Sequence, residues 1–157
     1  MPGPTRRQSS LIAATVLSLL TVTVFAVSRN QGPESAIQRY HEALDNFADP
    51  TALNAAFNLP DGQRPGTLDA VRFATVQDSQ ARETQAFHSE ILRLLRESQS
   101  VRAGKVHRSG RIGLVDVVYA SRFGVMTVRY AMQKGRSGWL IDTAETLRRT
   151  RALMGFG

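Results

Sequence analysis

The sequence predicts an amino-terminal transmembrane helix followed by an α+β domain, in which two to three helices pack on one face of a curved four-stranded antiparallel sheet. Three observations lead to this prediction. The stretch Ile112–Thr143 is rich in Val, Tyr, Phe and Met and contains three consecutive strand-like segments. The residues before it repeat apolar side chains every three or four positions, which is typical of amphipathic helices. An uncharged run, Gln8–Ser28, is long enough for one membrane-spanning helix.

Alternation along the strand-like segments predicts which side chains share a face. We expect Arg122-Phe123 to form the first turn and Gly135-Arg136 to centre the second, so that Met132 faces Trp139. A shift of one residue in the pairing of these strands would place the apolar side chains of one strand on the opposite face. One face then becomes wholly apolar or aromatic, with Val115, Val117, Tyr119, Met126, Val128, Tyr130, Met132, Trp139 and Ile141. The other face carries a row of opposite charges across three strands, Asp116, Arg129 and Asp142.

Two to three helices are expected between the amino-terminal segment and the sheet. The first begins at Glu34 and carries its apolar residues at intervals of three and four. Asp49-Pro50 has the pattern of a helix start, with Asp as N-cap and Pro in the first helical position. A shorter piece starts near Thr67, and the strongest helical pattern runs over Ser79–Ser98. A first strand follows from about Val101, and after Thr143 the chain becomes helical again or frays.

Five segments are predicted along the chain. They are a basic cytoplasmic amino terminus (1–10), a transmembrane anchor or signal segment (11–28), a linker (29–33), the α+β domain (34–144) and a basic carboxy-terminal tail (145–157). Arg6 and Arg7 precede the apolar run Leu11–Val27, which keeps the amino terminus in the cytoplasm and places the domain outside it. The alternatives are a signal peptide cleaved near Ala26-Val27-Ser28, which would leave a secreted domain, and a buried soluble helix.

Composition excludes several kinds of chemistry. The chain has no cysteine, so it has no disulfide, thiolate metal site, thiol nucleophile or lipidated cysteine. The three histidines, His41, His88 and His107, fall on separate elements, and none has a second ligand type at metal-binding spacing. The sequence contains no glycine-rich phosphate loop, nucleophile elbow or Ser/His/Asp order. We therefore expect no metal and no cofactor.

Charge is divided unevenly along the chain. Residues 34–97 contain six Arg against ten acidic residues, a net charge of −4, whereas residues 98–157 contain eleven basic residues against three acidic ones, a net charge of +8. Such a division favours an interaction surface, although a solvated Arg-rich sheet is the alternative. Candidate partners are anionic lipid headgroups, an acidic protein surface or a second copy of the chain; nucleic acid is not expected. The candidate basic face contains Arg102, Lys105, Arg108, Arg111, Arg122 and Arg136.

Residues 34–143 resemble the NTF2-like (cystatin-like) α+β superfamily, in which a curved antiparallel sheet wraps a long amino-terminal helix and forms a cone. The resemblance rests on the order of the elements, on Ala48-Asp49-Pro50-Thr51-Ala52-Leu53 and on Gly138-Trp139-Leu140-Ile141-Asp142. The superfamily includes enzymes, ligand carriers and structural adaptors, so it implies no single activity. A membrane helix followed by such a domain also resembles in layout the VirB8-like inner-membrane subunits of secretion machines.

The apolar face of the sheet has two interpretations. It either packs under the helices as core or lines a cavity in the cone for a small apolar ligand. Isomerase-like chemistry needs a carboxylate or histidine in that cavity, and the predicted register keeps Asp116 and Asp142 off this face. We expect a membrane-anchored, periplasmic domain that acts by protein binding or assembly without catalysis. The alternative is a small-molecule-binding or isomerase-like enzyme that uses the cone. The candidate pocket residues are Tyr40, Tyr119, Met126, Tyr130 and Trp139.

Overall fold

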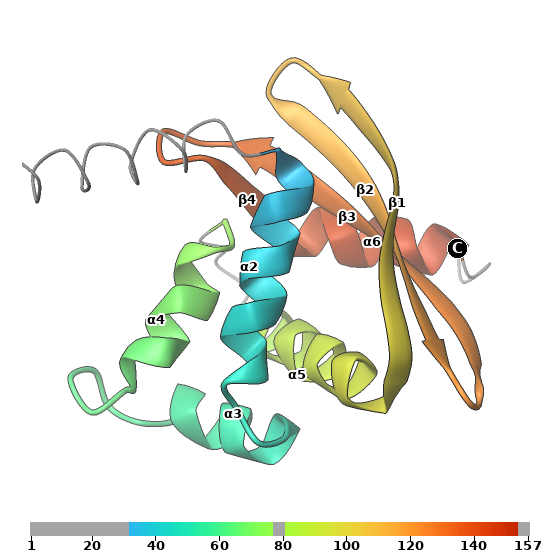
Figure 1. Ribbon diagram of the computed structural model, residues 1–157. Helices are drawn as coiled ribbons and strands as arrows, with labels where there is room; N and C mark the ends of the chain where they lie inside the picture. Colours follow the sequence, from blue (N-terminus) through green and yellow to red (C-terminus); the bar gives the residue numbers. More distant parts are fainter. Residues whose placement is uncertain (1–31, 77–80, 154–157) are drawn as a thin grey trace, which may run out of the picture. The chain divides into compact units, whose positions relative to one another are not determined.

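Residues 32–76 and 81–153 are described by the computed structural model of the chain (Figure 1). In these ranges an α+β fold combines five helices with one four-stranded antiparallel sheet. The predicted membrane segment Leu11–Val27 lies outside them. None of the helices within the described ranges has the length and apolar character that crossing a membrane requires.

The described helices outnumber the two or three expected. They are α2 (Pro33–Asp45), α3 (Pro50–Phe57), α4 (Gly66–Phe73), α5 (Ala81–Glu97) and α6 (Thr143–Leu153). The start of α3 confirms the predicted cap, because the carboxylate of Asp49 accepts a hydrogen bond from the backbone N–H of Ala52 at 2.8 Å. Helices α3 and α4 have eight residues each and begin where the Asp49-Pro50 cap and the piece near Thr67 were predicted.

The four strands are paired in the order β1-β2-β3-β4. Arg122-Phe123 forms the turn between β2 and β3, as predicted, and Gly124 after it has a φ of 147°, a value that favours glycine. Val115 pairs with Tyr130 and Asp116 with Arg129, which confirms the predicted register of β2 against β3. The bounds of the strands are Ser98–Ser109 for β1, Ile112–Ser121 for β2, Gly124–Lys134 for β3 and Trp139–Asp142 for β4.

The predicted register of β4 against β3 is wrong by two residues. A four-residue loop replaces the two-residue turn, closed by a 2.8 Å hydrogen bond from the N–H of Gly135 to the carbonyl of Gly138. Met132 therefore pairs with Ile141 instead of Trp139. A shift of two preserves the face of every side chain, so Trp139 stays buried. It also moves Asp142 opposite Ala131, out of line with Arg129.

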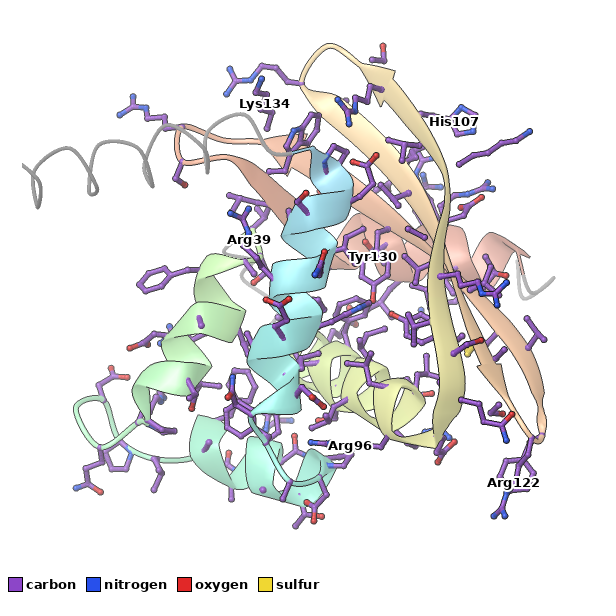
Figure 2. The ribbon with its side chains drawn as sticks, viewed as in Figure 1. Arg39, Arg96, His107, Arg122, Tyr130 and Lys134 are labelled. Carbon is purple, nitrogen blue, oxygen red and sulfur yellow. The ribbon has the colours of Figure 1, made fainter. Side chains whose placement is uncertain are left out.

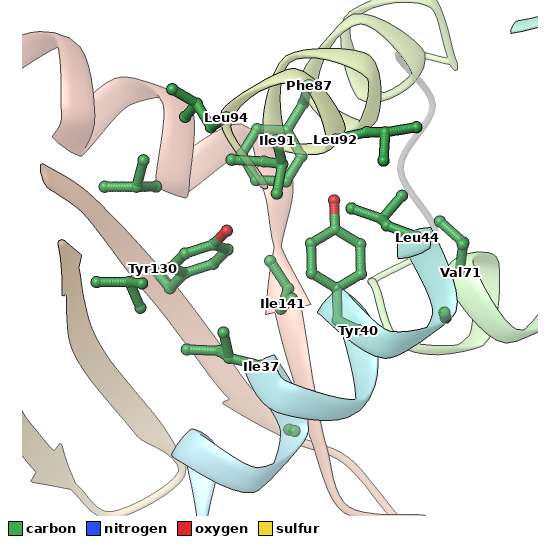
Figure 3. Packing of buried hydrophobic residues seen from close by; sticks show 14 of the residues in the cluster. Ile37, Tyr40, Leu44, Val71, Phe87, Ile91, Leu92, Leu94, Tyr130 and Ile141 are labelled. Carbon is green, nitrogen blue, oxygen red and sulfur yellow. The ribbon is translucent and has the colours of Figure 1, made fainter. Parts of the chain in front are cut away.

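The hydrophobic core lies between one face of the sheet and the helices α2 and α5 (Figures 1 and 3). Tyr40 of α2 and Tyr130 of β3 are fully buried near its centre, and Ile37 and Ile141 lie around them. Burial of one large apolar side chain stabilises a fold by about 1.5–3 kcal/mol. A helical layer over one apolar face of the sheet is thus present, as the predicted α+β class requires.

Helix α6 and the segment Ala74–Val76 close the sheet on the side of β3 and β4. The N–H and carbonyl of Ile141 in β4 bond to Ala74 and Val76, at 2.9 and 2.8 Å. Strand β4 is short and leaves part of β3 without a neighbouring strand. Helix α6 covers this part, where the hydroxyl of Thr146 accepts a hydrogen bond from the N–H of Ala131 at 3.0 Å. Residues 145–151, predicted as a tail, thus belong to a helix that packs against β3.

Candidate functional site

A hydrogen-bonded group of tyrosines and histidines occupies the interior between α2 and the sheet. The hydroxyls of Tyr119 and Tyr130 are 2.6 Å apart, and Nε2 of His41 lies 2.8 Å from the Tyr119 hydroxyl and 3.1 Å from that of Tyr130. A second pair adjoins it, with the hydroxyl of Tyr40 2.7 Å from Nδ1 of His88 on α5. We call these five residues the phenol–imidazole cluster.

The positions of these residues on their elements explain how the cluster forms. Tyr40 and His41 are neighbours on α2, so their side chains point about 100° apart around the helix axis. Tyr40 meets His88 on α5, whereas His41 meets the tyrosines of the sheet. Tyr119 and Tyr130 share the inner face but are not paired, because the Val117–Val128 pair lies between them in the ladder. Their side chains lean toward each other along the strands until the hydroxyls meet.

Burial keeps every member of the cluster uncharged at neutral pH. It lowers the pKa of His41 and of His88 to about 4, because the charged imidazolium loses its hydration. The same effect raises the pKa values of Tyr40, Tyr119 and Tyr130 above the usual tyrosine value. His88 Nε2 is the single buried side-chain nitrogen or oxygen without a partner in the described part of the chain, and the ring of Phe57 stacks on that imidazole.

Sequence reasoning treated the histidines as isolated and did not anticipate the cluster. A signal was present, because three tyrosines were predicted on inward faces, and a buried tyrosine hydroxyl almost always finds a hydrogen-bond partner. His41 and His88, on the two helices that cover this face, were the available imidazoles. No group of three or more His, Cys, Asp or Glu side chains in the described ranges is arranged to hold a metal ion.

The two acids of the predicted charge row lie on the outer face of the sheet. Asp116 accepts two hydrogen bonds from the Arg129 guanidinium, at 2.6 and 2.8 Å, and this contact lowers the pKa of the carboxyl. Asp142 has a different role from the one predicted. Its carboxylate accepts a hydrogen bond from the N–H of Glu145 at 3.0 Å, which caps α6, and another from the Gln133 amide at 2.6 Å.

The predicted pocket residues separate into two groups. Tyr40, Tyr119 and Tyr130 are at most 1% exposed, and Trp139 packs over Gly113, where a Cβ would lie 3.1 Å from the indole ring. Met126 is half-buried and lines a groove of about 430 Å³ between α5 and α6. The other lining residues of this groove are Glu83, Ala86, Phe87, Glu90, Ile91, Leu94, Val128, Leu147, Thr150 and Arg151.

The predicted basic residues are distributed over both ends of the sheet. Arg122 lies at the β2–β3 turn, with its guanidinium 4.5 Å from the centre of the Phe123 ring. Arg108, Arg111 and Arg136 lie at the opposite end, near the start of α2, together with Lys134. Figure 2 shows Arg122 and Lys134 far apart, at the two ends of the sheet. Arg102 and Lys105 are exposed on β1 between these ends.

Large apolar side chains are exposed at a few positions. Phe123 is 76% exposed and Val125 is 71% exposed, and the two lie within three residues at the β2–β3 turn. Phe73 at the end of α4 and Ile112 at the start of β2 are the other large apolar side chains more than half exposed in the part of the chain that the structure describes. Comparison with known protein families, with curated proteins and with solved structures found no match.

Proposed function

We propose that this chain is a single-pass membrane protein with its domain in the periplasm, where it works as a non-catalytic protein-binding or assembly module. The sequence supports the anchor through the uncharged run Leu11–Val27 and the preceding Arg6 and Arg7. The NTF2-like resemblance is compatible with this role, because that superfamily includes structural adaptors. The domain would then be tethered at the start of α2.

The observation that carries the binding role is the β2–β3 hairpin tip, Arg122–Val125. It combines two exposed large apolar side chains with an arginine stacked on the aromatic ring. Single exposed apolar residues are normal in soluble domains, but adjacent ones rimmed by polar groups favour a contact surface. Aromatic and arginine side chains also contribute disproportionately to binding energy at protein interfaces.

The interior offers less support for catalysis. A general base must reach a substrate proton and have a pKa suited to the working pH. The Nε2 atom of His41 is already bonded to tyrosine hydroxyls, and no carboxylate takes part in the hydrogen bonds of the cluster. Asp116 and Asp142 are engaged on the outer face. With the exception of His88 Nε2, the buried polar groups of the cluster therefore form hydrogen bonds with one another.

Photo-cross-linking in intact membranes tests the binding role, with a photoreactive phenylalanine analogue at position 123. Phe73 provides a matched control, because it is 74% exposed against 76% for Phe123 but lies on α4, away from the hairpin tip. We expect a discrete adduct from position 123 and none of the same mass from position 73. Equal adducts at both positions, or none at 123, would contradict the proposal, and a mature chain that begins at Arg29 would contradict the anchor.

A second candidate function is an isomerase-like or ligand-binding enzyme that uses the cone, and one observation favours it. His41 is the one member of the cluster that is only half-buried, and it contacts both sheet tyrosines. A phenol hydrogen-bonded in this way is able to polarise a ligand carbonyl. Titration with an apolar ketone, followed by the NMR signals of the His41 ring, tests this role. An unchanged spectrum at saturating ketone would exclude it.

A further inference from the structure

Four basic side chains gather at the end of the sheet where α2 begins, and we call them the α2-end cluster: Arg108, Arg111, Lys134 and Arg136. Arg111 connects the β1–β2 turn to the end of β3, because its guanidinium donates to the carbonyl of Lys134 at 3.2 and 3.0 Å. The N–H of Lys134 in turn donates to the carbonyl of Arg111 at 2.8 Å. Arg136 lies two residues beyond, in the loop between β3 and β4.

Three of these four charges have no acidic partner within the described residues. Arg108 forms an ion pair with Glu34 in the first turn of α2, at 3.1 Å, which places the cluster beside the start of that helix. The ion pairs formed among the described residues do not include Arg111, Lys134 or Arg136, and all three side chains are exposed. Ile112, 58% exposed, adds an apolar side chain next to them.

Chain length fixes how far this end can lie from the predicted membrane segment. That segment ends at Val27, and α2 begins at Pro33, so five residues, Ser28–Gly32, connect them. Even a fully extended connection of this length spans at most about 20 Å. The ten-residue strand β2 extends about 33 Å from this end to the hairpin tip. An anchored domain therefore keeps the α2-end cluster, which adjoins the start of α2, close to the end of the anchor, whereas the connection allows the hairpin tip to lie farther from the membrane.

We propose that the α2-end cluster binds the anionic phospholipid headgroups of the leaflet in which the anchor ends. Arg111, Lys134 and Arg136 contact the lipid phosphates, for which guanidinium groups have matching donor geometry, and Ile112 reaches the interface. This contact fixes the orientation of the domain and directs the hairpin tip away from the bilayer. The inference rests on the membrane anchor of the proposed function.

The test uses the full chain in lipid nanodiscs, with a single fluorescent label. Because the protein has no cysteine, Ser137→Cys in the exposed β3–β4 loop gives one reporter beside the cluster. Ala55→Cys on α3, which follows the far end of α2, gives the control reporter. Discs of phosphatidylcholine alone are compared with discs that also contain phosphatidylglycerol, and a neutral water-soluble quencher measures the accessibility of each label.

We expect the label at position 137 to be protected from quenching only in the anionic discs, and the label at position 55 to be accessible in both. High salt should remove the protection, because it screens exposed charges. Each basic side chain near an anionic surface contributes about a fivefold factor. The triple variant Arg111→Gln, Lys134→Gln, Arg136→Gln should therefore lower the docked-to-undocked ratio by about a hundredfold.

Two further variants separate charge from folding. The charge-retaining variant Arg111→Lys, Lys134→Arg, Arg136→Lys should keep the protection. The variant Arg102→Gln, Lys105→Gln, Arg122→Gln removes the same net charge from β1 and the hairpin tip and should also keep it. Equal loss in both neutralised variants would overturn the inference, because it would reflect net charge alone.

The remaining outcomes distinguish this inference from the proposed function. Equal protection in both kinds of disc, or none in either, overturns the lipid contact while the anchor stands, provided that alkaline carbonate leaves the chain in the disc. A chain released by carbonate overturns both the anchor and the contact. Protection that appears only after a second protein is added would assign the cluster to a protein partner and overturn the inference.

Discussion

The hydroxyl of Tyr119 on β2 and Nε2 of His41 on α2 lie 2.8 Å apart and join the sheet to the helix that covers it. Tyr119 also makes the shorter of the two contacts to Tyr130, at 2.6 Å, so its hydroxyl is the centre of the sheet side of the cluster. The Tyr130 hydroxyl is 3.1 Å from the same imidazole nitrogen and depends on Tyr119 for its closest contact.

Removal of the Tyr119 hydroxyl should therefore destabilise the domain more than removal of the Tyr130 hydroxyl. We expect Tyr119→Phe to lower the free energy of unfolding by about 1–2 kcal/mol, because two buried polar atoms lose their nearest partner. Tyr130→Phe leaves the Tyr119–His41 bond intact and should cost about 1 kcal/mol or less. Urea denaturation at neutral pH measures both. The reverse order would show that Tyr119 is not the centre of the cluster.

Stability should fall as the pH is lowered from about 6.5 toward 4. Burial lowers the pKa of His41 and His88 to about 4, whereas the pKa of a solvated histidine is about 6.5. In this window the unfolded chain binds protons that the folded chain does not, so full stability is present above the unfolded pKa and is lost with acidification. Between these two pKa values, each histidine should lower the free energy of unfolding by about 1.4 kcal/mol for each unit by which the pH falls.

Denaturant titrations at pH 7 and pH 5 measure this effect. His107, which is exposed on β1, provides the matched control. We expect His107→Asn to leave the difference between the two pH values unchanged, and His88→Asn to reduce it. A difference that does not change in His88→Asn would mean that other groups cause the acid sensitivity.

Asp142 should contribute to stability as a helix cap, whatever its charge. Its carboxylate accepts the N–H of Glu145, and loss of an N-cap side chain costs about 1 kcal/mol. Asp142→Ala should therefore lower the free energy of unfolding by about that amount, and Asp142→Asn should be close to wild type because asparagine caps equally well. Thermal and urea unfolding decide the matter. Equal losses in both variants would indicate that the charge itself is what stabilises.

The Thr146 hydroxyl should protect the edge of β3. It accepts the N–H of Ala131 and donates to the carbonyl of Asp142 at 2.6 Å. Thr146→Val keeps the size and shape of the side chain but leaves that buried N–H without a partner, which costs about 1–3 kcal/mol. Hydrogen exchange should show a faster amide at Ala131. Thr150→Val removes a longer hydrogen bond, 3.3 Å, from the backbone N–H of Arg129. It should therefore accelerate the exchange of that amide less.

Alternation within strands was predictable because a side chain's face depends only on parity. The burial of Val115, Tyr130 and Ile141 on one face follows from it, as does the Asp116–Arg129 pair on the other. The length of the β3–β4 loop was not predictable in the same way, because glycines at both 135 and 138 allow more than one closure. The resulting shift of two residues changed the partner of Asp142 without changing its face.

The sequence left the segment after Thr143 open between a helix and a frayed end, and it did not predict that α6 packs on the sheet. The contacts of this helix with β3 are made by threonine hydroxyls at positions 146 and 150 instead of an apolar stripe. Apolar periodicity therefore does not predict that this helix packs against β3. The phenol–imidazole cluster was missed because each histidine, read alone, has no partner in sequence; only the packing of α2 and α5 brings His41 and His88 to the tyrosines.

The two sides of the sheet have unequal capacity for further pairing. Ala74–Val76 and α6 cover the β3 and β4 side, whereas β1 has no neighbouring strand on its outer side within the described residues. Among the described residues, β1 is therefore the strand that leaves its outer side open to an added strand. Two copies that met antiparallel through β1 would use up both open sides, so self-association by this route would stop at a symmetric pair and could not continue into a fibre.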